Sequence, residues 1–431
     1  MRLQRTFRFL IVLLMVACGN RPLHADNTLK PIPDLPVFNL NADSIYYPMG
    51  DKAVFTHFFS KLDTLRLSGK GHVNILHIGG SHIQAGMFSN QIRRNLASVF
   101  PSVNRDMIFP FSVAKTNNPV NYRSRYTGKW QVAKNVQRNP VYELGLTGMC
   151  VGTTDPAATI FIQMKGDTIN PLNDTIRTFS SVYVLANNDA PLTPCVETMD
   201  SCFTGEYDPV YQAYVYHLPC KVDSFRLRFE NNPDLTGTTA DFRLRGFWLD
   251  NPQPGISYVD IGVNGASVPS YLKCSLLEQD LALVKPDLCI LSVGINDASG
   301  YNFDVNLFQE NYKELIRRIR SVAPDCVILF TTNNDSYRRV KRSYQNNKNG
   351  ALAQKAFYSL ADYHKAGVWD LFSLMGGLGS MRKWEQHGLS RRDKVHFTPQ
   401  GYMLLGDLVY NALMRDYLQY STAQDHAQHV E

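Results

Sequence analysis

A chain of 431 residues exceeds the usual length of one domain, so we expect two. Hydrophobic residues make up 44% of it and charged residues 19%, which is typical of a globular protein and excludes a disordered or membrane-embedded chain. The net charge of +6 is mild. The densest basic group is too small to indicate nucleic-acid binding, and we interpret it as a solvated loop or helix face: Arg338, Arg339, Lys341 and Arg342.

The first 25 residues have the pattern of an export signal. Three arginines precede nine apolar residues at 9–17, a run too short to span a bilayer. Cys18 follows Leu-Met-Val-Ala, which resembles a bacterial lipoprotein cleavage box and predicts a lipid anchor at Cys18; ordinary cleavage near Ala25 is the alternative. We therefore expect an exported bacterial protein, in the periplasm or as a lipoprotein at the outer membrane or cell surface.

Residues 26–50 are rich in Pro and Asn and predict an extended leader. An apolar stripe then predicts a helix over 51–67, and an apolar, β-branched run predicts a buried strand over 73–78. A second helix is expected from Gln84 to about residue 100. These elements form the first part of a strand–helix domain.

The pattern changes over residues 101–254, where helical periodicity is nearly absent. Short apolar or alternating runs recur there, separated by Gly, Pro, Asn and Asp, which predicts an inserted antiparallel β-sandwich. The clearest runs are 158–164, 181–185, 213–217, 224–229 and 241–247.

Strands and helices alternate again over 255–431, so residues 51–100 and 255–431 predict one α/β domain with a parallel sheet and helices on both faces. Its remaining strands are expected at 258–263, 287–293, 326–332 and 368–371, and its helices at 268–283, 306–322, 352–365 and 399–417. Active sites of such sheets lie beyond the carboxyl ends of the strands.

Four of the eight cysteines fall in the insert, and in an oxidising compartment they could form two disulfides of undetermined pairing: Cys150, Cys195, Cys202 and Cys220. No Cys-x-x-Cys spacing occurs, so we expect neither a zinc site nor another metal or cofactor. Nothing in the sequence indicates an oligomeric state.

Ser81 follows Gly79 and Gly80 at the predicted turn from strand to helix, a position that exposes a hydroxyl. Taken alone, this serine is more simply explained as a helix cap. Near the other end of the chain, Asp393 and His396 form an Asp-x-x-His pair, which suits a general base and the carboxylate that orients it.

Two further blocks follow predicted strands, Asn264-Gly265 and Gly294-Ile295-Asn296-Asp297. Serine, glycine, asparagine and histidine in this order resemble the four blocks of the SGNH (GDSL-type) hydrolase superfamily. The resemblance implies a three-layer α/β/α fold in which Ser81 is the nucleophile, His396 the base and Asp393 its orienting acid. It also implies an oxyanion hole made of the N–H groups of Ser81 and Gly265 and the side-chain amide of Asn296.

One position departs from the family pattern, because Gly80 stands where the family usually has Asp. That carboxylate is not a triad member, so we expect the chemistry to survive with different hydrogen bonds supporting the loop. Asp297 is interpreted as structural, and His82 as a residue that orders the loop.

The insert between the serine and glycine blocks is similar to the layout of bacterial peptidoglycan O-acetylesterases, which carry a carbohydrate-binding-like sandwich. The resemblance implies an exported serine esterase that removes O-acetyl groups from a glycan, with peptidoglycan as the leading candidate and an acetylated glycan as its partner. A polysaccharide O-acetyltransferase on the same scaffold, or a glycan-binding protein without turnover, remains an alternative.

Overall fold

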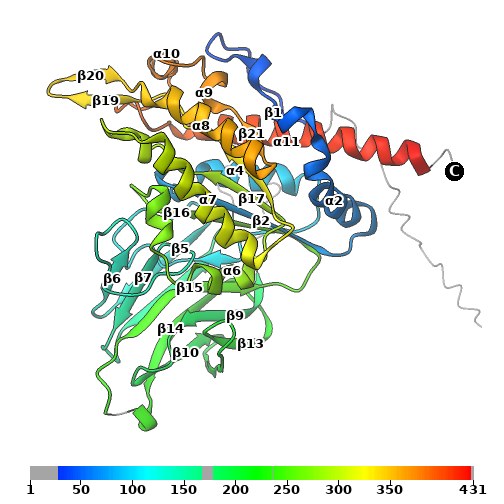
Figure 1. The fold of residues 1–431 in the computed structure, drawn as a ribbon. Helices are drawn as coiled ribbons and strands as arrows, with labels where there is room; N and C mark the ends of the chain where they lie inside the picture. Colours follow the sequence, from blue (N-terminus) through cyan, green and yellow to red (C-terminus); the bar gives the residue numbers. More distant parts are fainter. Residues whose placement is uncertain (1–27, 167–177, 236, 429–431) are drawn as a thin grey trace, which may run out of the picture.

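A seven-stranded sheet lies at the centre of the computed structural model, which describes residues 28–166, 178–235 and 237–428 (Figure 1). The predicted signal segment, with Cys18, lies outside the described residues. Six of the strands run parallel, and β1 pairs antiparallel with β21 at one edge. In spatial order the strands are β1 (Ile45–Tyr46), β21 (Gly367–Trp369), β18 (Val327–Thr331), β17 (Leu288–Ser292), β2 (His72–Gly79), β16 (Gly255–Gly262) and β3 (Val103–Asn104).

The central strand β2 is buried on both faces of this sheet. Val73 and Ile75 belong to one apolar cluster and Leu76 and Ile78 to another, and none of the four is more than 1% exposed. All eight residues of the neighbouring strand β16 are buried as well. Burial on both faces explains why most residues of these strands are apolar.

Helices cover both faces of the sheet, which confirms the predicted α/β class. One layer shares the cluster of Ile75 and consists of α2 (Thr56–Ser68), α4 (Met87–Ala97) and α11 (Pro399–Gln428). The other shares the cluster of Leu76 and consists of α5 (Val268–Leu272), α6 (Leu277–Val284), α7 (Val305–Val322) and α8 (Asn349–His364).

The order of the parallel strands indicates where along the sheet a ligand site is expected. The first strand of the domain, β2, lies between β16 and β17, which follow it in the chain. The chain therefore leaves β2 in one direction along the sheet and returns to continue in the other, which is the topological switch point where α/β sheets bind ligands. The loops after β2, β16 and β17 meet at this point.

The remaining shorter elements belong mostly to this domain, and the turn at Pro233–Leu235 belongs to the insert. They are the 3-10 turns at Leu40–Ala42, Pro48–Gly50, Lys52–Phe55, Pro233–Leu235 and Asp297–Ser299, the helices α3 (Ser81–Gln84), α9 (Leu371–Leu374) and α10 (Ser380–Gln386), and the hairpin strands β19 (Tyr337–Val340) and β20 (Ser343–Asn346).

Several expected elements differ in the structure. The helix predicted over 268–283 is two helices, because Leu276 donates its N–H to Leu144 of the insert at 3.0 Å and interrupts the helical ladder. Gly86, with φ of +73°, separates α3 from α4. The basic group that we interpreted as a loop or helix face is the β19–β20 hairpin, and the predicted leader contributes strand β1 to the sheet.

Val103–Asn104 belongs to the central sheet as β3, and the other described strands of residues 101–254 form two antiparallel sheets. One has the order β11 (Ser201–Thr204), β10 (Leu192–Thr198), β14 (Ser224–Asn231), β8 (Thr159–Met164), β5 (Tyr122–Thr127). The other has the order β12 (Glu206–Asp208), β13 (Ala213–Val222), β9 (Phe179–Ala186), β15 (Phe242–Asp250), β7 (Met149–Thr153), β6 (Gln131–Lys134), with β4 (Met107–Ile108) also paired to β15. Aromatic rings of the two sheets contact each other, with 5.1 Å between the ring centres of Phe225 and Phe247.

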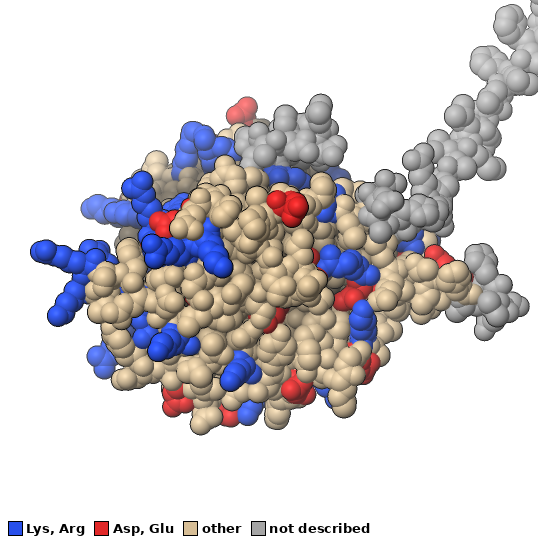
Figure 2. Space-filling model, turned by 90° about the horizontal axis from the view of Figure 1, so that it is seen from above, with Lys and Arg blue, Asp and Glu red and all other residues tan. Residues whose placement is uncertain are grey.

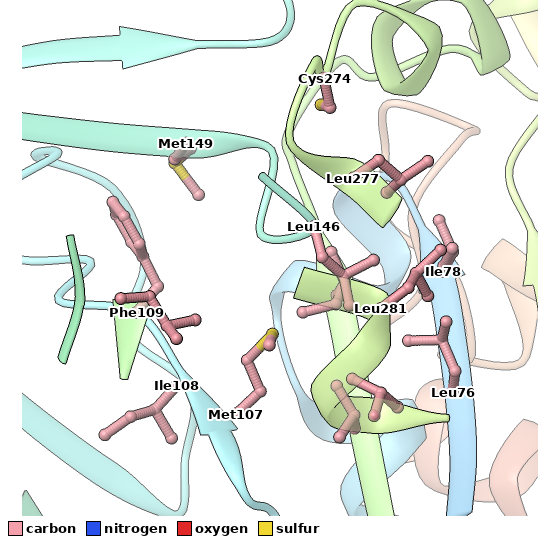
Figure 3. Close-up of a cluster of buried hydrophobic side chains, with 14 of the residues drawn as sticks. Leu76, Ile78, Met107, Ile108, Phe109, Leu146, Met149, Cys274, Leu277 and Leu281 are labelled. Carbon is pink, nitrogen blue, oxygen red and sulfur yellow. The ribbon is translucent and has the colours of Figure 1, made fainter. Parts of the chain in front are cut away.

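The insert shares an apolar core with the central domain along a surface that we call the seam. Leu76 and Ile78 of β2 and Leu281 of α6 belong to the same buried cluster as Met107 and Leu146 of the insert (Figure 3). Buried ion pairs also cross the seam, since Arg245 of β15 pairs with Asp280 of α6 at 3.1 Å. The insert therefore packs against the central sheet through apolar side chains and charges together.

The structure contains one of the two disulfides that the sequence allowed. Cys195 and Cys202 are bridged between β10 and β11. Cys150 is free and buried in β7, whereas Cys220 is free and exposed in β13, so these two thiols lie in different environments and form no second bridge. Among the described residues, no helix is long and apolar enough to cross a membrane.

Candidate active site

Ser81 lies directly after the central strand, at the switch point of the sheet. Gly79 is required there, because a Cβ atom at that position would lie 2.2 Å from Cγ1 of Ile83. The Tyr271 hydroxyl donates to the Gly79 carbonyl at 2.7 Å and holds the end of the strand. Ser81 is the first residue of α3, a helix of only four residues, so its environment depends on the turn more than on a helix dipole.

The serine and histidine blocks meet although 315 residues separate them. The Ser81 Oγ lies 2.8 Å from Nε2 of His396, and Nδ1 of His396 lies 2.9 Å from Oδ2 of Asp393. A hydroxyl, an imidazole and a carboxylate in this sequence of contacts have the geometry of a nucleophile, its general base and an orienting acid.

The turn from Asp393 to His396 is fixed by its own hydrogen bonds. Oδ1 of Asp393 accepts the N–H groups of Val395 and His396, each at 2.9 Å, and Lys394 adopts the left-handed conformation with φ of +57°. Burial raises the pKa of the Asp393 carboxyl, but these N–H groups and the imidazole outweigh it, so the pKa lies below its ordinary value. The Asp393 carboxylate is therefore ionised under the conditions in which His396 acts as a base.

The predicted oxyanion donors line the same cleft as Ser81. Gly265 has φ of +84°, which favours glycine, and the N–H groups of Ser81 and Gly265 donate to no described residue. The cleft has a volume of about 660 Å³. Its lining includes Ser81, Ala85, Met87, Asn117, Asn118, Val120, Asn264, Gly265, Ile295, Asn296, Arg391, Val395, His396 and Tyr402.

Gly80, where the sequence departs from the family pattern, lies beside the side chain of Asn296. Nδ2 of Asn296 donates to the Ala266 carbonyl at 2.8 Å, which leaves its second N–H available. A Cβ atom at Gly80 would lie 3.4 Å from Nδ2 of Asn296 and 3.5 Å from the Ala266 carbonyl oxygen. The backbone of Ala266 thus supports the asparagine at a point that a side chain at position 80 would face.

Asp297 fixes this loop through a backbone hydrogen bond, which is the structural role that the sequence indicated. Both of its carboxylate oxygens lie 3.2 Å from the N–H of Val268, at the start of α5. Burial raises the pKa of Asp297 to about 6. Asp297 therefore ties the asparagine block to the helix that follows the glycine block.

His82 supports the histidine block and is itself held by the last helix. Its Nδ1 lies 2.8 Å from the Tyr402 hydroxyl, and its ring centre lies 5.2 Å from that of His396. Burial, together with the nearby His396, lowers the pKa of His82 to about 3. His82 is thus neutral and orders the loop, which is the role that the sequence favoured.

The insert contributes a wall of the cleft that sequence reasoning missed. Asn117, Asn118 and Val120 line it, and the neighbouring Thr116 accepts a hydrogen bond from Nε2 of Gln84 at 2.7 Å. Oε1 of Gln84 in turn accepts the N–H of Asn264 at 2.7 Å, just before the glycine of the oxyanion block. No motif marks these residues, because the contact depends on where the insert folds back.

Arg391 also lines the cleft, and the only signal for it was its place two residues before Asp393. Among the described residues, the single set of side chains close enough to hold a metal ion is Cys195, Cys202 and Glu230, and the disulfide uses both thiols. That set belongs to the insert and is not part of the cleft.

Comparison with known proteins adds two findings. Residues 237–404 match the model of the GDSL-like Lipase/Acylhydrolase family, a range that contains Gly265, Asn296, Asp393 and His396 but begins after Ser81. Most of the 101–254 insert lies between Ser81 and the matched range, and the fold brings Ser81 back to His396. None of the curated proteins matches the chain.

Among solved structures, a peptidoglycan O-acetylesterase shares the fold with a TM-score of 0.66, at 20% identity, over 83% of this chain and 95% of that one. A lipase/acylhydrolase from Enterococcus faecalis matches at 24% identity over 37% of this chain and 76% of that one, with a TM-score of 0.30. The acetyl xylan esterase AlAXEase matches at 20% identity over 37% of this chain and 82% of that one, with a TM-score of 0.30.

Proposed function

We propose that the chain is an esterase of the GDSL-like lipase/acylhydrolase type that hydrolyses O-acetyl esters on a glycan, with peptidoglycan as the leading candidate. The observation that carries this proposal is the line of contacts from Ser81 through His396 to Asp393 at the edge of an open cleft. The acetyl group and the glycan are supported by the shared fold with a peptidoglycan O-acetylesterase over most of the chain.

The chemistry follows from the positions of these groups. Oγ of Ser81 attacks the ester carbonyl while Nε2 of His396 takes its proton, and Asp393 holds the imidazole in the required tautomer and stabilises the imidazolium. The negative charge on the carbonyl oxygen is bound by the N–H groups of Ser81 and Gly265 and by the amide of Asn296. His396 then protonates the sugar oxygen, which leaves, and water releases acetate from Ser81 by the reverse sequence.

The exposure of the site favours hydrolysis over transfer to a second sugar. The side chain of His396 is 35% exposed and that of Asp393 46%, so water reaches the base beside an acetylated Ser81. A transferase depends on excluding water at this step.

We also propose the organisation of the chain around this site. Residues 1–25 are an export signal with a lipid anchor at Cys18, and the protein acts in the periplasm or at the cell surface. Residues 51–100 and 255–431 form the catalytic domain, after a leader at 26–50, and residues 101–254 form an inserted, carbohydrate-binding-like β-sandwich. The ring contact between Phe225 and Phe247 supports the sandwich, and the basic and apolar pattern of the first residues supports export.

Acetate release from a small aryl acetate and from O-acetylated peptidoglycan tests the proposal. We expect Ser81→Ala to lower both rates by about 10⁴-fold or more, and Ser60→Ala, a surface serine of α2, to leave them unchanged. An unchanged rate in Ser81→Ala would refute the mechanism. Glycan binding without acetate release from any substrate would indicate a binding protein, and faster transfer to an added oligosaccharide than to water would indicate a transferase.

A further inference from the structure

The positive charge of the molecule is concentrated in two short segments, 337–348 and 382–394. Together they contain 10 Lys and Arg residues and 2 acidic residues. The whole chain has 44 basic and 38 acidic residues, so the rest of it has 34 and 36 and a net charge of −2. The net charge of +6 therefore arises from these segments alone.

The two segments lie side by side in the structure. The N–H of Tyr337, which begins the β19–β20 hairpin, donates to the Lys394 carbonyl at 3.0 Å. The Lys394 ammonium lies 5.1 Å from the ring centre of Tyr344, on the other strand of the hairpin. The hairpin is thus attached to the turn that holds Asp393 and His396.

Eight basic side chains of these segments are exposed, and none of them forms an ion pair with a described residue. Figure 2 shows Lys and Arg side chains gathered at the left end of the molecule, the side on which Figure 1 places the hairpin. We call this set the basic surface: Arg339, Lys341, Arg342, Lys348, Arg382, Lys383, Arg391 and Arg392.

Two exposed tyrosines accompany these charges. Tyr301 is 75% exposed and Tyr344 is 42% exposed, which is unusual for rings of this size. The guanidinium of Arg338 lies 5.1 Å from the ring centre of Tyr301. Exposed rings beside cations provide flat apolar faces for sugar rings and charges for their acidic groups.

The basic surface is continuous with the catalytic cleft. Arg391 lines the cleft together with Ser81, and its N–H donates to the His396 carbonyl at 2.8 Å. A polymer that places an ester at Ser81 and continues past Arg391 reaches Arg392 and the hairpin. This continuity favours the substrate itself as the ligand, over a membrane or a nucleic acid.

We propose that the basic surface binds carboxylate groups of the substrate glycan, so that the enzyme acts on an acidic polysaccharide rather than a neutral one. The inference rests on the proposed function for the link between binding and turnover. The binding itself depends only on the surface, and it is measured without catalysis.

The test compares two triple variants with equal loss of charge. Arg339→Gln, Lys341→Gln and Arg342→Gln together remove the hairpin charges, and the control removes three scattered, exposed lysines instead: Lys70→Gln, Lys221→Gln and Lys355→Gln. Each set is combined with Ser81→Ala, and binding to polygalacturonate and to neutral xylan is measured at low and high salt. We expect the hairpin variant to bind polygalacturonate about tenfold more weakly or worse at low salt, and the control to bind as the parent does.

Turnover is measured separately with Ser81 intact. The hairpin variant should hydrolyse a neutral aryl acetate at the parental rate and release acetate more slowly from an acetylated acidic polysaccharide. Equal binding by the hairpin and control variants, or tighter binding of xylan than of polygalacturonate, would overturn the proposal. Preferred binding to phosphatidylglycerol vesicles or single-stranded DNA would overturn it too. If the parent protein released acetate from no ester but still bound polygalacturonate through the basic surface, the proposed esterase activity would be refuted and the binding of an acidic polysaccharide would stand.

Discussion

The catalytic edge and the seam are built in opposite ways. The catalytic edge consists of the loops after β2, β16 and β17 and the turn at Asp393, and its groups are held by hydrogen bonds while partly open to water. The seam consists of fully buried apolar side chains and ion pairs whose members are at most 3% exposed. We therefore expect changes at the edge to alter rate with little effect on stability, and changes at the seam to do the reverse.

The largest effect is expected at the edge, from Asp393→Asn. The amide keeps the oxygen that accepts the N–H groups of Val395 and His396, but it removes the charge and favours the wrong imidazole tautomer. Turnover should fall by about 10⁴-fold while the melting temperature changes little. Because hydrogen bonds keep the pKa of Asp393 low, the parent should retain its orienting carboxylate in mild acid. A pH–rate profile of both proteins is the measurement, and near-parental activity of Asp393→Asn would mean that another group orients His396.

The strongest test of the seam is Asp260→Ala. Asp260 of β16 is buried between Arg93, at 2.8 Å, and Arg105 of the insert, and their charges hold its pKa low against the effect of burial. Removing it deprives the buried guanidinium groups of Arg93 and Arg105 of the carboxylate between them, which should cost about 3–5 kcal/mol in the free energy of unfolding. Chemical denaturation measures this cost, and Glu310→Gln, which breaks an exposed ion pair with Lys313, should have a much smaller effect on stability. Equal costs would remove the distinction between the seam and the surface.

A smaller effect on rate is expected from Asn296→Ala. Loss of one oxyanion donor should lower kcat by about 10²–10³-fold without changing the melting temperature. Asn117→Ala is the matched control, because it removes the same side chain from the insert's wall of the same cleft. If both variants lost the same activity on an aryl acetate, Asn296 would be a lining residue and not an oxyanion donor.

The smallest predicted effect is a change in stability when Asp297, which binds the asparagine block to α5, is substituted. Its pKa of about 6 in the folded protein is above the usual value near 3.9, so the protonated form favours folding and that stabilisation is lost as pH rises through about 6. Asp297→Asn keeps an acceptor for Val268 and removes the buried charge. When thermal unfolding is measured across pH, the Asp297→Asn variant should be more stable than the parent by about 1–2 kcal/mol at pH 8 and equally stable at pH 4. If the stability gained by Asp297→Asn did not depend on pH, the buried carboxylate charge would not be the source of that gain.

The sequence predicted the edge far better than the seam. The strands around Ile75 and Tyr258 were recognisable because burial makes their sequences rich in apolar residues, and the serine and glycine blocks follow those strands. The positions of Ser81, Gly265, Asn296 and His396 thus follow from local patterns that the parallel sheet brings together.

The seam depends on contacts that have no local pattern. Leu276 leaves its helix because Leu144 accepts its N–H, and Asp280 is buried because Arg245 lies opposite, although 132 and 35 residues separate these pairs in the chain. Thr116 reaches Gln84 for the same reason. Tertiary contacts override helix periodicity at such points, so only the folded structure reveals them.

Strand β1 has a practical consequence for where the catalytic domain begins. Ile45 and Tyr46 pair with the outer edge of β21, and the carboxylate of Asp43 accepts the indole N–H of Trp369 at 3.1 Å. A recombinant protein that starts at residue 51 would expose that edge as a row of unpaired N–H and C=O groups, which recruits strands from other copies and leads to aggregation. Soluble expression therefore needs a start upstream of Asp43, so that each molecule protects its own sheet.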